Sequence, residues 1–200
     1  GKSTLLRFIN RLTQPSSGEV RIGGEPPPTT RADLRRLRSQ VGMIFQDHNS
    51  FAHLDVWTNV ALGISADLKL DTQQHERVDE ALTRVGLSDF KARKATELSG
   101  GERQRIAIAR ALVRDKPVLL LDEPFTALGP ALRRDMLDLI REIQVERKLT
   151  ILMVTHQPED ARYAASRIAF VQNGRIAHVL PTKQFFAASA PVEISAYLRG

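Results

Sequence analysis

Apolar residues follow two spacings along the chain, one typical of helices and one typical of buried strands. Near the start, Leu5, Phe8, Ile9 and Leu12 have the i, i+3, i+4 and i+7 spacing of one helix face. Uninterrupted apolar runs instead indicate strands buried on both faces, as in a parallel sheet. Together these signals predict helices over 33–37, 72–85, 88–95, 131–147 and 183–188, and strands over 19–22, 41–45, 118–121 and 150–154.

The order of these elements predicts an α/β fold with a mostly parallel sheet. Residues from about 47 to 112 are mostly helical and are predicted to form a subdomain inserted in the α/β core. Near the end of the chain, Asn173-Gly174 lies between apolar runs over 168–172 and 175–179, which predicts a hairpin with a type I′ turn. Pro158 is predicted to begin a further helix. The whole of 1–200 is predicted to be one domain.

The charge, the cysteine content and the length of the apolar runs exclude several classes of function. The chain has 29 Lys and Arg against 23 Asp and Glu, a formal charge of +6. The basic residues are mixed with acidic ones, so a solvated surface is favoured over a nucleic-acid interface. No cysteine is present, which excludes disulfides and thiolate metal sites within the sequence. No apolar run approaches the ~20 residues of a membrane span, so a role at a membrane is expected to require a partner.

Two motifs in the middle of the chain carry candidate chemistry. Ser99-Gly100-Gly101 precedes an apolar helix, whose bare first-turn N–H groups would form an anion site. That helix stops at Lys116-Pro117, and the strand 118–121 follows. Asp122 and Glu123 come directly after the strand, at the sheet edge where open α/β sheets bind ligands.

The first four residues match the end of a P-loop, G-x-x-x-x-G-K-[ST]. In this interpretation Lys2 reaches the β- and γ-phosphates, Ser3 places its hydroxyl on Mg²⁺, and the N–H groups of Gly1 to Thr4 cradle phosphate. The first glycine of the motif and a preceding strand fall before Gly1. The chain is therefore predicted to be N-terminally truncated.

Residues 98–104 resemble the signature motif of the ATP-binding-cassette (ABC) ATPases, and 118–123 resemble their Walker B strand. The resemblance implies a P-loop NTPase core, ATP and Mg²⁺ as ligands, and ATP hydrolysis. It implies that Ser3, Gln46 and Asp122 hold Mg²⁺ and that Glu123 accepts a proton from the attacking water. It further implies that Gln46 and His156 complete the surroundings of the γ-phosphate. Gly129 stands where the family normally has Asp, in the D-loop.

The resemblance also implies partners. Ser99, Gly100 and Gly101 would cap the ATP of a second copy in a head-to-tail dimer. The apolar groups over 47–61 would receive the transmembrane permease subunits, placing the chain at the cytoplasmic face of the inner membrane. A solute-binding protein would act indirectly through the permease, and no nucleic acid is expected.

Three hypotheses about the biological role remain open. Residues 51–64, 119–136 and 149–177 look like the thiamine-import ATPases, whereas 5–22 looks more like the ATPases of polar amino-acid importers. A soluble ABC protein acting on ribosomes or nucleic acid is the alternative from another class. A truncated and inactive fragment is the third.

Overall fold

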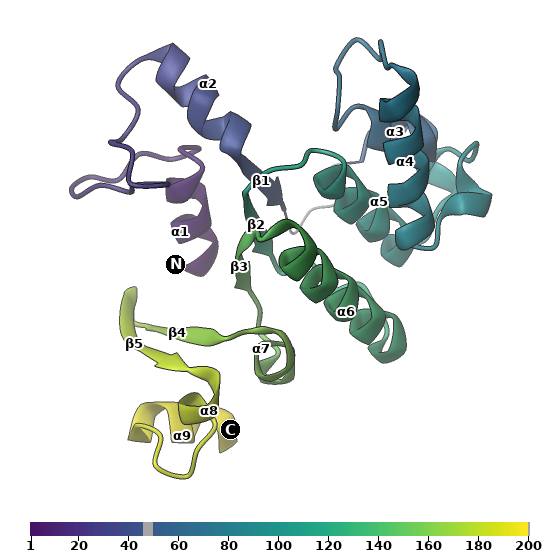
Figure 1. Cartoon of the computed structure of the whole chain (residues 1–200). Helices are drawn as coiled ribbons and strands as arrows, with labels where there is room; N and C mark the ends of the chain where they lie inside the picture. Colours follow the sequence, from purple (N-terminus) through teal and green to yellow (C-terminus); the bar gives the residue numbers. More distant parts are fainter. Residues whose placement is uncertain (46–49, 200) are drawn as a thin grey trace.

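The computed structural model describes residues 1–45 and 50–199. Its centre is a parallel sheet in the order β1-β2-β3, formed by β1 (Val41–Ile44), β2 (Val118–Asp122) and β3 (Thr150–Val154). Ile44 pairs with Leu121, and Asp122 pairs with Val154. Because the strands are parallel, their carboxyl ends lie at one edge of the sheet (Figure 1).

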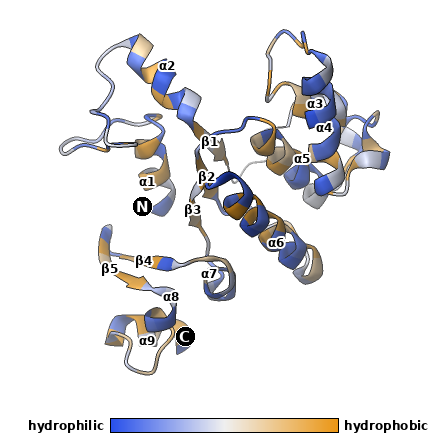
Figure 2. Ribbon diagram, in the orientation of Figure 1, coloured by the Kyte–Doolittle hydropathy of each residue, from blue (hydrophilic) through white to orange (hydrophobic). Residues whose placement is uncertain are grey.

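Alternate residues of β2 pack against helices on opposite faces of the sheet. Leu119 and Leu121 belong to a core shared with α5 (Gly100–Leu112) and α6 (Pro130–Arg147). Leu120 packs on the other face with Leu6 of α1 (Lys2–Ile9). β2 is therefore covered on both sides, as its continuous apolar run predicts. Hydrophobic and hydrophilic residues alternate along α6 (Figure 2), and its predicted apolar stripe is buried: Met136, Leu139, Ile140 and Ile143.

The helical part of the chain lies beyond β1 and includes α3 (Val56–Ala61), α4 (Thr72–Arg84) and α5 (Figure 1). α4 matches the predicted helix over 72–85, and the chain leaves it through Gly86 in the left-handed region (φ 65°). The single helix predicted over 88–95 is wrong. Two short 3₁₀ helices, η1 (Ser88–Phe90) and η2 (Ala95–Glu97), stand there instead.

The segment before β1 differs from its prediction in one place. The helix expected over 33–37 is confirmed and longer: α2 (Arg31–Gln40) begins with a capping box between Thr30 and Asp33. The strand expected over 19–22 is wrong, because only an isolated bridge joins Ile22 to Glu25. Gly23 and Gly24 both have positive φ and turn the chain sharply, so no ladder extends from the bridge.

After β3 the chain forms α7 (Pro158–Ala164), the antiparallel pair β4 (Arg167–Gln172) and β5 (Arg175–Pro181), α8 (Thr182–Phe185) and α9 (Val192–Arg199). Asn173 and Gly174 both have positive φ, which confirms the type I′ turn. The helix predicted over 183–188 is present as the shorter α8.

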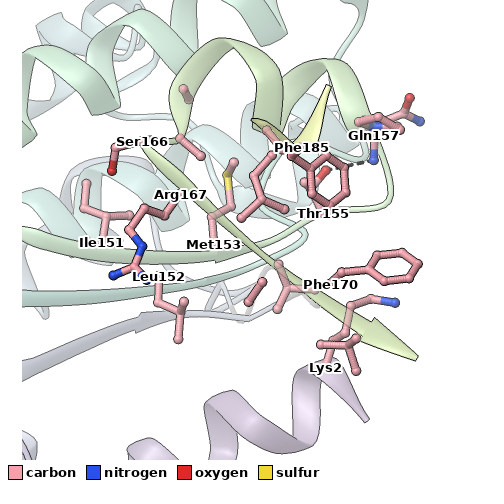
Figure 3. A pocket seen from close by; sticks show the side chains of 18 of the residues that line it. Lys2, Ile151, Leu152, Met153, Thr155, Gln157, Ser166, Arg167, Phe170 and Phe185 are labelled. Atoms are coloured by element: carbon pink, nitrogen blue, oxygen red, sulfur yellow. Dashed lines mark hydrogen bonds between the residues drawn. The ribbon is translucent and has the colours of Figure 1, made fainter. Parts of the chain in front are cut away.

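An open groove of about 1210 Å³ runs along the outer edge of β3. In the described part of the chain β3 pairs with β2 alone, and its other edge faces side chains of α1, α7, β4 and α9 across this groove (Figure 3). Only Val154 of β3 is consequently buried, although the sequence predicts a strand buried throughout. Among the helices that the structure describes, none is long and apolar enough to cross a membrane.

Candidate functional site

α1 begins with backbone donors that no side chain caps. Gly1 is its N-cap residue and offers no side-chain hydrogen bond. The first N–H groups of a helix have no partner within the helix, and the helix dipole makes this end positive. Lys2, Ser3 and Thr4 therefore present N–H groups, and Lys2 an ammonium group, with the chemistry that phosphate needs. Lys2 lies with Thr155 and Gln157 toward one end of the groove (Figure 3).

Ser3 and Asp122 lie together at the carboxyl end of β2. The Ser3 hydroxyl donates a hydrogen bond of 3.0 Å to Oδ1 of Asp122. Asp122 is almost fully buried, because β2 is covered on both faces. The packing of α1 on Leu120 thus brings a hydroxyl from the first turn to a carboxylate that is 119 residues away in sequence.

This pair fits Mg²⁺ by the chemistry of its donors. Mg²⁺ prefers oxygen ligands and is usually bound by one or two carboxylates with substrate phosphates and water. Within residues 1–45 and 50–199, no group of three or more His, Asp or Glu side chains is arranged to hold a metal. A magnesium ion would therefore need phosphate oxygens beside Ser3 and Asp122. Gln46, also predicted as a ligand, lies outside the described residues.

Glu123 and His156 form a second pair at the same edge of the sheet. Oε1 of Glu123 lies 2.5 Å from Nε2 of His156. The Glu123 side chain is 11% exposed and that of His156 is 61% exposed. The Glu123 N–H donates to the carbonyl of Val154 at 2.9 Å, which continues the β2–β3 pairing one residue further. Parallel register thus explains why the residues after β2 and β3 meet.

Thr155 and Asp160 support the turn that presents His156, and the sequence analysis gave neither a role. The Thr155 hydroxyl donates to Asp160 at 3.2 Å and accepts from the N–H of Gln157 at 3.0 Å. Burial raises the pKa of Asp160, while the charge of Arg133 and the Thr155 hydrogen bond lower it. A threonine three residues before a helix start is a turn signal that could have identified this support.

The turn at residues 99–101, called the signature turn below, opens α5 as predicted. Fewer of its N–H groups are free than the sequence predicts, because Glu102 forms a capping box with Ser99. The Ser99 N–H and hydroxyl each donate to Oε2 of Glu102 at 2.7 Å, and Ser99 Oγ accepts from the Glu102 N–H at 3.3 Å. These hydrogen bonds lower the pKa of Glu102. Gly100 and Gly101 keep N–H groups without a side-chain cap.

The predicted residues therefore fall into two places. Ser3, Asp122, Glu123 and His156 gather where β2 and β3 end, with Lys2 on the adjoining first turn of α1. The signature turn instead packs against the chain that follows Glu123, near Ala127 and Leu128. The first place can bind a phosphate group and deprotonate a water beside it, and the second offers further N–H donors.

Residues 1–126 match the family described as "ABC transporter". Two relatives are both described as "Thiamine import ATP-binding protein ThiQ". The protein from Mesorhizobium japonicum is 48% identical over 99% of this chain and 77% of its own length. The protein from Rhizobium meliloti is 53% identical over 88% of this chain and 72% of its own length.

Two solved structures are similar throughout the fold. A dimeric ATP-binding cassette in a post-hydrolysis state, bound to ADP and Pi, has a TM-score of 0.83 at 30% identity, covering 91% of this chain and 81% of its own. CbiO1 from Clostridium perfringens, described as part of the ABC transporter complex cbiONQ, also has a TM-score of 0.83, at 32% identity. It covers all of this chain and 79% of its own.

Proposed function

The chain belongs to the ABC transporter family of ATPases, and we propose that it is the energy-coupling subunit of a bacterial importer whose solute is thiamine. The pairing of Ser3 with Asp122 beside Glu123 carries the ATPase part of this proposal. Relatives that are 46–53% identical and described as thiamine-import proteins support the solute.

In the proposed mechanism the start of α1 binds the phosphates of ATP. The N–H groups of Gly1 to Thr4 and the ammonium of Lys2 neutralise phosphate charge. Ser3, Asp122 and Gln46 would hold Mg²⁺, which offsets the charge that develops on the phosphoryl oxygens. Positioning and charge neutralisation supply most of the catalysis in phosphoryl transfer.

Glu123 accepts the proton of the attacking water in this proposal. Its carboxylate is shielded from solvent and touches the exposed imidazole of His156, so the two side chains can hold one water between them and the γ-phosphate. A placed general base is typically worth about 10²–10⁴ in rate. His156 contributes by holding the carboxylate and contacting the γ-phosphate.

The signature turn acts on a second copy of the chain. Its Ser99, Gly100 and Gly101 would cap the ATP bound by the P-loop of the partner, and two nucleotides would lie between two chains in a head-to-tail dimer. The dimeric neighbour bound to ADP and Pi supports the association of two chains.

A surface near Phe51 is proposed to receive the transmembrane permease at the cytoplasmic face of the inner membrane. The Phe51 side chain is 46% exposed, whereas Leu54 and Trp57 are half-buried. The Trp57 Nε1–H donates to Asp79 at 3.0 Å, so part of its role is to hold α3 on α4. Phe51 is therefore the sharpest position at which to test docking.

Uptake of labelled thiamine tests the importer proposal. The chain, carrying a complete P-loop ahead of Lys2, is expressed in bacteria that lack their own thiamine-import ATPase but keep its permease and solute-binding protein. We expect uptake to be restored and the chain to co-purify with the permease. Restored uptake of a polar amino acid instead, or co-purification with ribosomes, would contradict the proposal.

Phe51→Glu should uncouple transport from ATP hydrolysis. The backbone N–H and carbonyl of Phe51 are both held by the buried Asn59 amide, so the loop should keep its place when the side chain changes. A carboxylate on the docking surface costs binding energy because it must be desolvated. The Arg110 guanidinium, whose carbon lies 5.2 Å from the centroid of the Phe51 ring, is already hydrogen-bonded to Asn59. We expect co-purification and uptake to fall at least about tenfold, with basal ATPase activity unchanged. Val145→Glu, at a position 73% exposed on α6, is the matched control and should have no effect.

Gly129→Asp should raise ATPase activity or its cooperativity with little change in melting temperature. Gly129 is the N-cap residue of α6 and has extended backbone. Apart from its chain neighbours, no heavy atom of the described residues would lie within 4 Å of a Cβ added to it. A cap change from Gly to Asp is worth only a few tenths of a kcal/mol. The family resemblance implies that an Asp here links the two ATP sites of the dimer. Paired ATP titrations at equal dimer concentration check this, and superimposable curves would make Gly129 a neutral substitution.

A further inference from the structure

Gln104 lies in the second turn of α5 and is 1% exposed. Both ends of its side-chain amide contact the loop that follows β2. Its Nε2 donates to the carbonyl of Glu123 at 3.4 Å, and its Oε1 accepts from the N–H of Ala127 at 3.2 Å. A buried amide that spans the two ends of residues 123–127 fixes the conformation of that loop, because each lost contact would leave a buried polar group unpaired.

The loop at residues 123–127 needs such support. Glu123 has φ of 51°, a left-handed conformation that non-glycine residues adopt only when their surroundings hold it. Its N–H is held by Val154, and its carbonyl also accepts from the hydroxyl of Thr126 at 3.1 Å. The direction of the Glu123 carboxylate thus depends on contacts made by its own peptide groups.

The signature turn packs directly on the same loop. A Cβ placed on Gly101 would lie 3.3 Å from a methyl group of Leu128 and 3.4 Å from the carbonyl oxygen of Ala127. A Cβ on Gly100 would lie 3.9 Å from that of Ala127. A shift at the start of α5 therefore reaches the loop by two routes, through these contacts and through Gln104 one turn further along the helix.

We propose that Gln104 is a positioning residue that couples the signature turn to Glu123, so that binding of a second copy's nucleotide at the turn sets the placement of this chain's own base. The inference rests on the proposed function, which gives the turn and Glu123 their roles in two different ATP sites. α5 carries both the turn and Gln104, and a helix transmits a displacement of its first turn to its second as a rigid unit.

Gln104→Met tests the coupling, because methionine fills a similar volume without either hydrogen bond. We expect kcat to fall roughly 10- to 100-fold, as for a small misplacement of a reacting group. KM for ATP should stay within about twofold. The nucleotide is bound by α1, and the variant does not change contacts that are equally strong in the ground state and the transition state. Gln73→Met, the same change at an exposed position of α4, is the control and should leave both constants unchanged.

A second variant, Gln104→Glu, keeps the shape of the side chain and replaces its amide N–H donor with a carboxyl oxygen. In Gln104→Glu the new carboxyl can still accept from Ala127, but it can donate to the Glu123 carbonyl only when protonated. We expect its activity relative to the unmodified chain to recover as pH falls, whereas Gln104→Met should show no such recovery. A pH-independent ratio for Gln104→Glu would overturn the proposal.

A double-mutant cycle separates coupling from a purely structural role. If Gln104 transmits the state of the signature turn, Ser99→Ala combined with Gln104→Met should lose less activity than the product of the two single losses. Three outcomes would each overturn the inference. The losses of the two single variants could multiply in the double variant, kcat of Gln104→Met could be unchanged, or that kcat could fall only in proportion to the fraction of chain that still binds nucleotide. Failure of the proposed function is distinguishable, because Glu123→Gln and Ser99→Ala would then retain activity by themselves.

Discussion

In the chain carrying a complete P-loop, Glu123→Gln should nearly abolish ATP turnover while ATP binding is retained. Glutamine keeps the shape of the side chain and its contact with His156 but cannot accept a proton from the attacking water. We expect kcat to fall about 10²–10⁴-fold, the typical contribution of a placed general base. Because closure of the proposed dimer would no longer end in hydrolysis, the variant should accumulate as an ATP-held dimer.

Single-turnover kinetics and size-exclusion chromatography with ATP and Mg²⁺ measure the two effects. Glu142→Gln, the same change at an exposed position of α6, serves as the control and should behave like the unmodified chain. Near-normal turnover in Glu123→Gln would remove Glu123 from the role of base. Lost ATP binding would show instead that the carboxylate supports the nucleotide site.

Asn59→Ala should cause a large loss of stability. Asn59 is fully buried, and its Nδ2 donates to the carbonyls of Phe51, Leu54 and Asp55 at 2.9–3.1 Å. Its Oδ1 accepts from Phe51 N–H at 2.8 Å and from Arg110 at 2.7 Å. Burial lowers the pKa of Arg110 to about 10, so that guanidinium is costly to leave with fewer partners.

We expect the free energy of unfolding to fall by about 3–5 kcal/mol, because several buried polar groups lose their partners at once. This corresponds to a decrease in melting temperature on the order of 10 °C for a chain of this size. Urea unfolding followed by circular dichroism measures it. Asn10→Ala is the matched control. Within the described residues, the Asn10 side chain makes only a 3.7 Å contact from Nδ2 to the sulfur of Met43, and its buried Oδ1 has no partner. Equal shifts for the two variants would contradict this account of Asn59.

The sequence predicts well those elements whose signal is local. The run of four apolar residues that begins β2 lies between a Lys-Pro stop and two carboxylates, and nothing distant is needed to recognise it. The type I′ turn at Asn173-Gly174 and the start of α6 at Pro130 are set by backbone preferences of the residues themselves. The pairing of Ser3 with Asp122 is foreseeable too, once Ser3 is assigned to the first turn of a helix and Asp122 to the end of a strand that this helix covers.

The sequence does not predict which side-chain amides are buried. Gln104 and Asn59 are polar, and the periodic pattern places polar residues on the outer face of a helix. Each amide is buried because the carbonyl and N–H groups of one loop surround it, residues 51–55 for Asn59 and 123–127 for Gln104. The placement of those loops depends on the packing of α3, α5 and β2. The failed strand over 19–22 has a related cause, since a strand needs a partner that the local sequence does not reveal.

The capping box at Ser99 has a consequence for how firmly two chains can hold one nucleotide. The Ser99 hydroxyl has a single proton, and in this chain Glu102 already accepts it at 2.7 Å. Binding a phosphate of the partner's nucleotide would therefore exchange one acceptor for another and leave an ionised carboxylate beside the incoming anion. Exchanges of this kind yield little net free energy. The binding free energy of the proposed dimer would thus be smaller than the number of its contacts suggests. A weak association suits an assembly that has to dissociate after every round of hydrolysis.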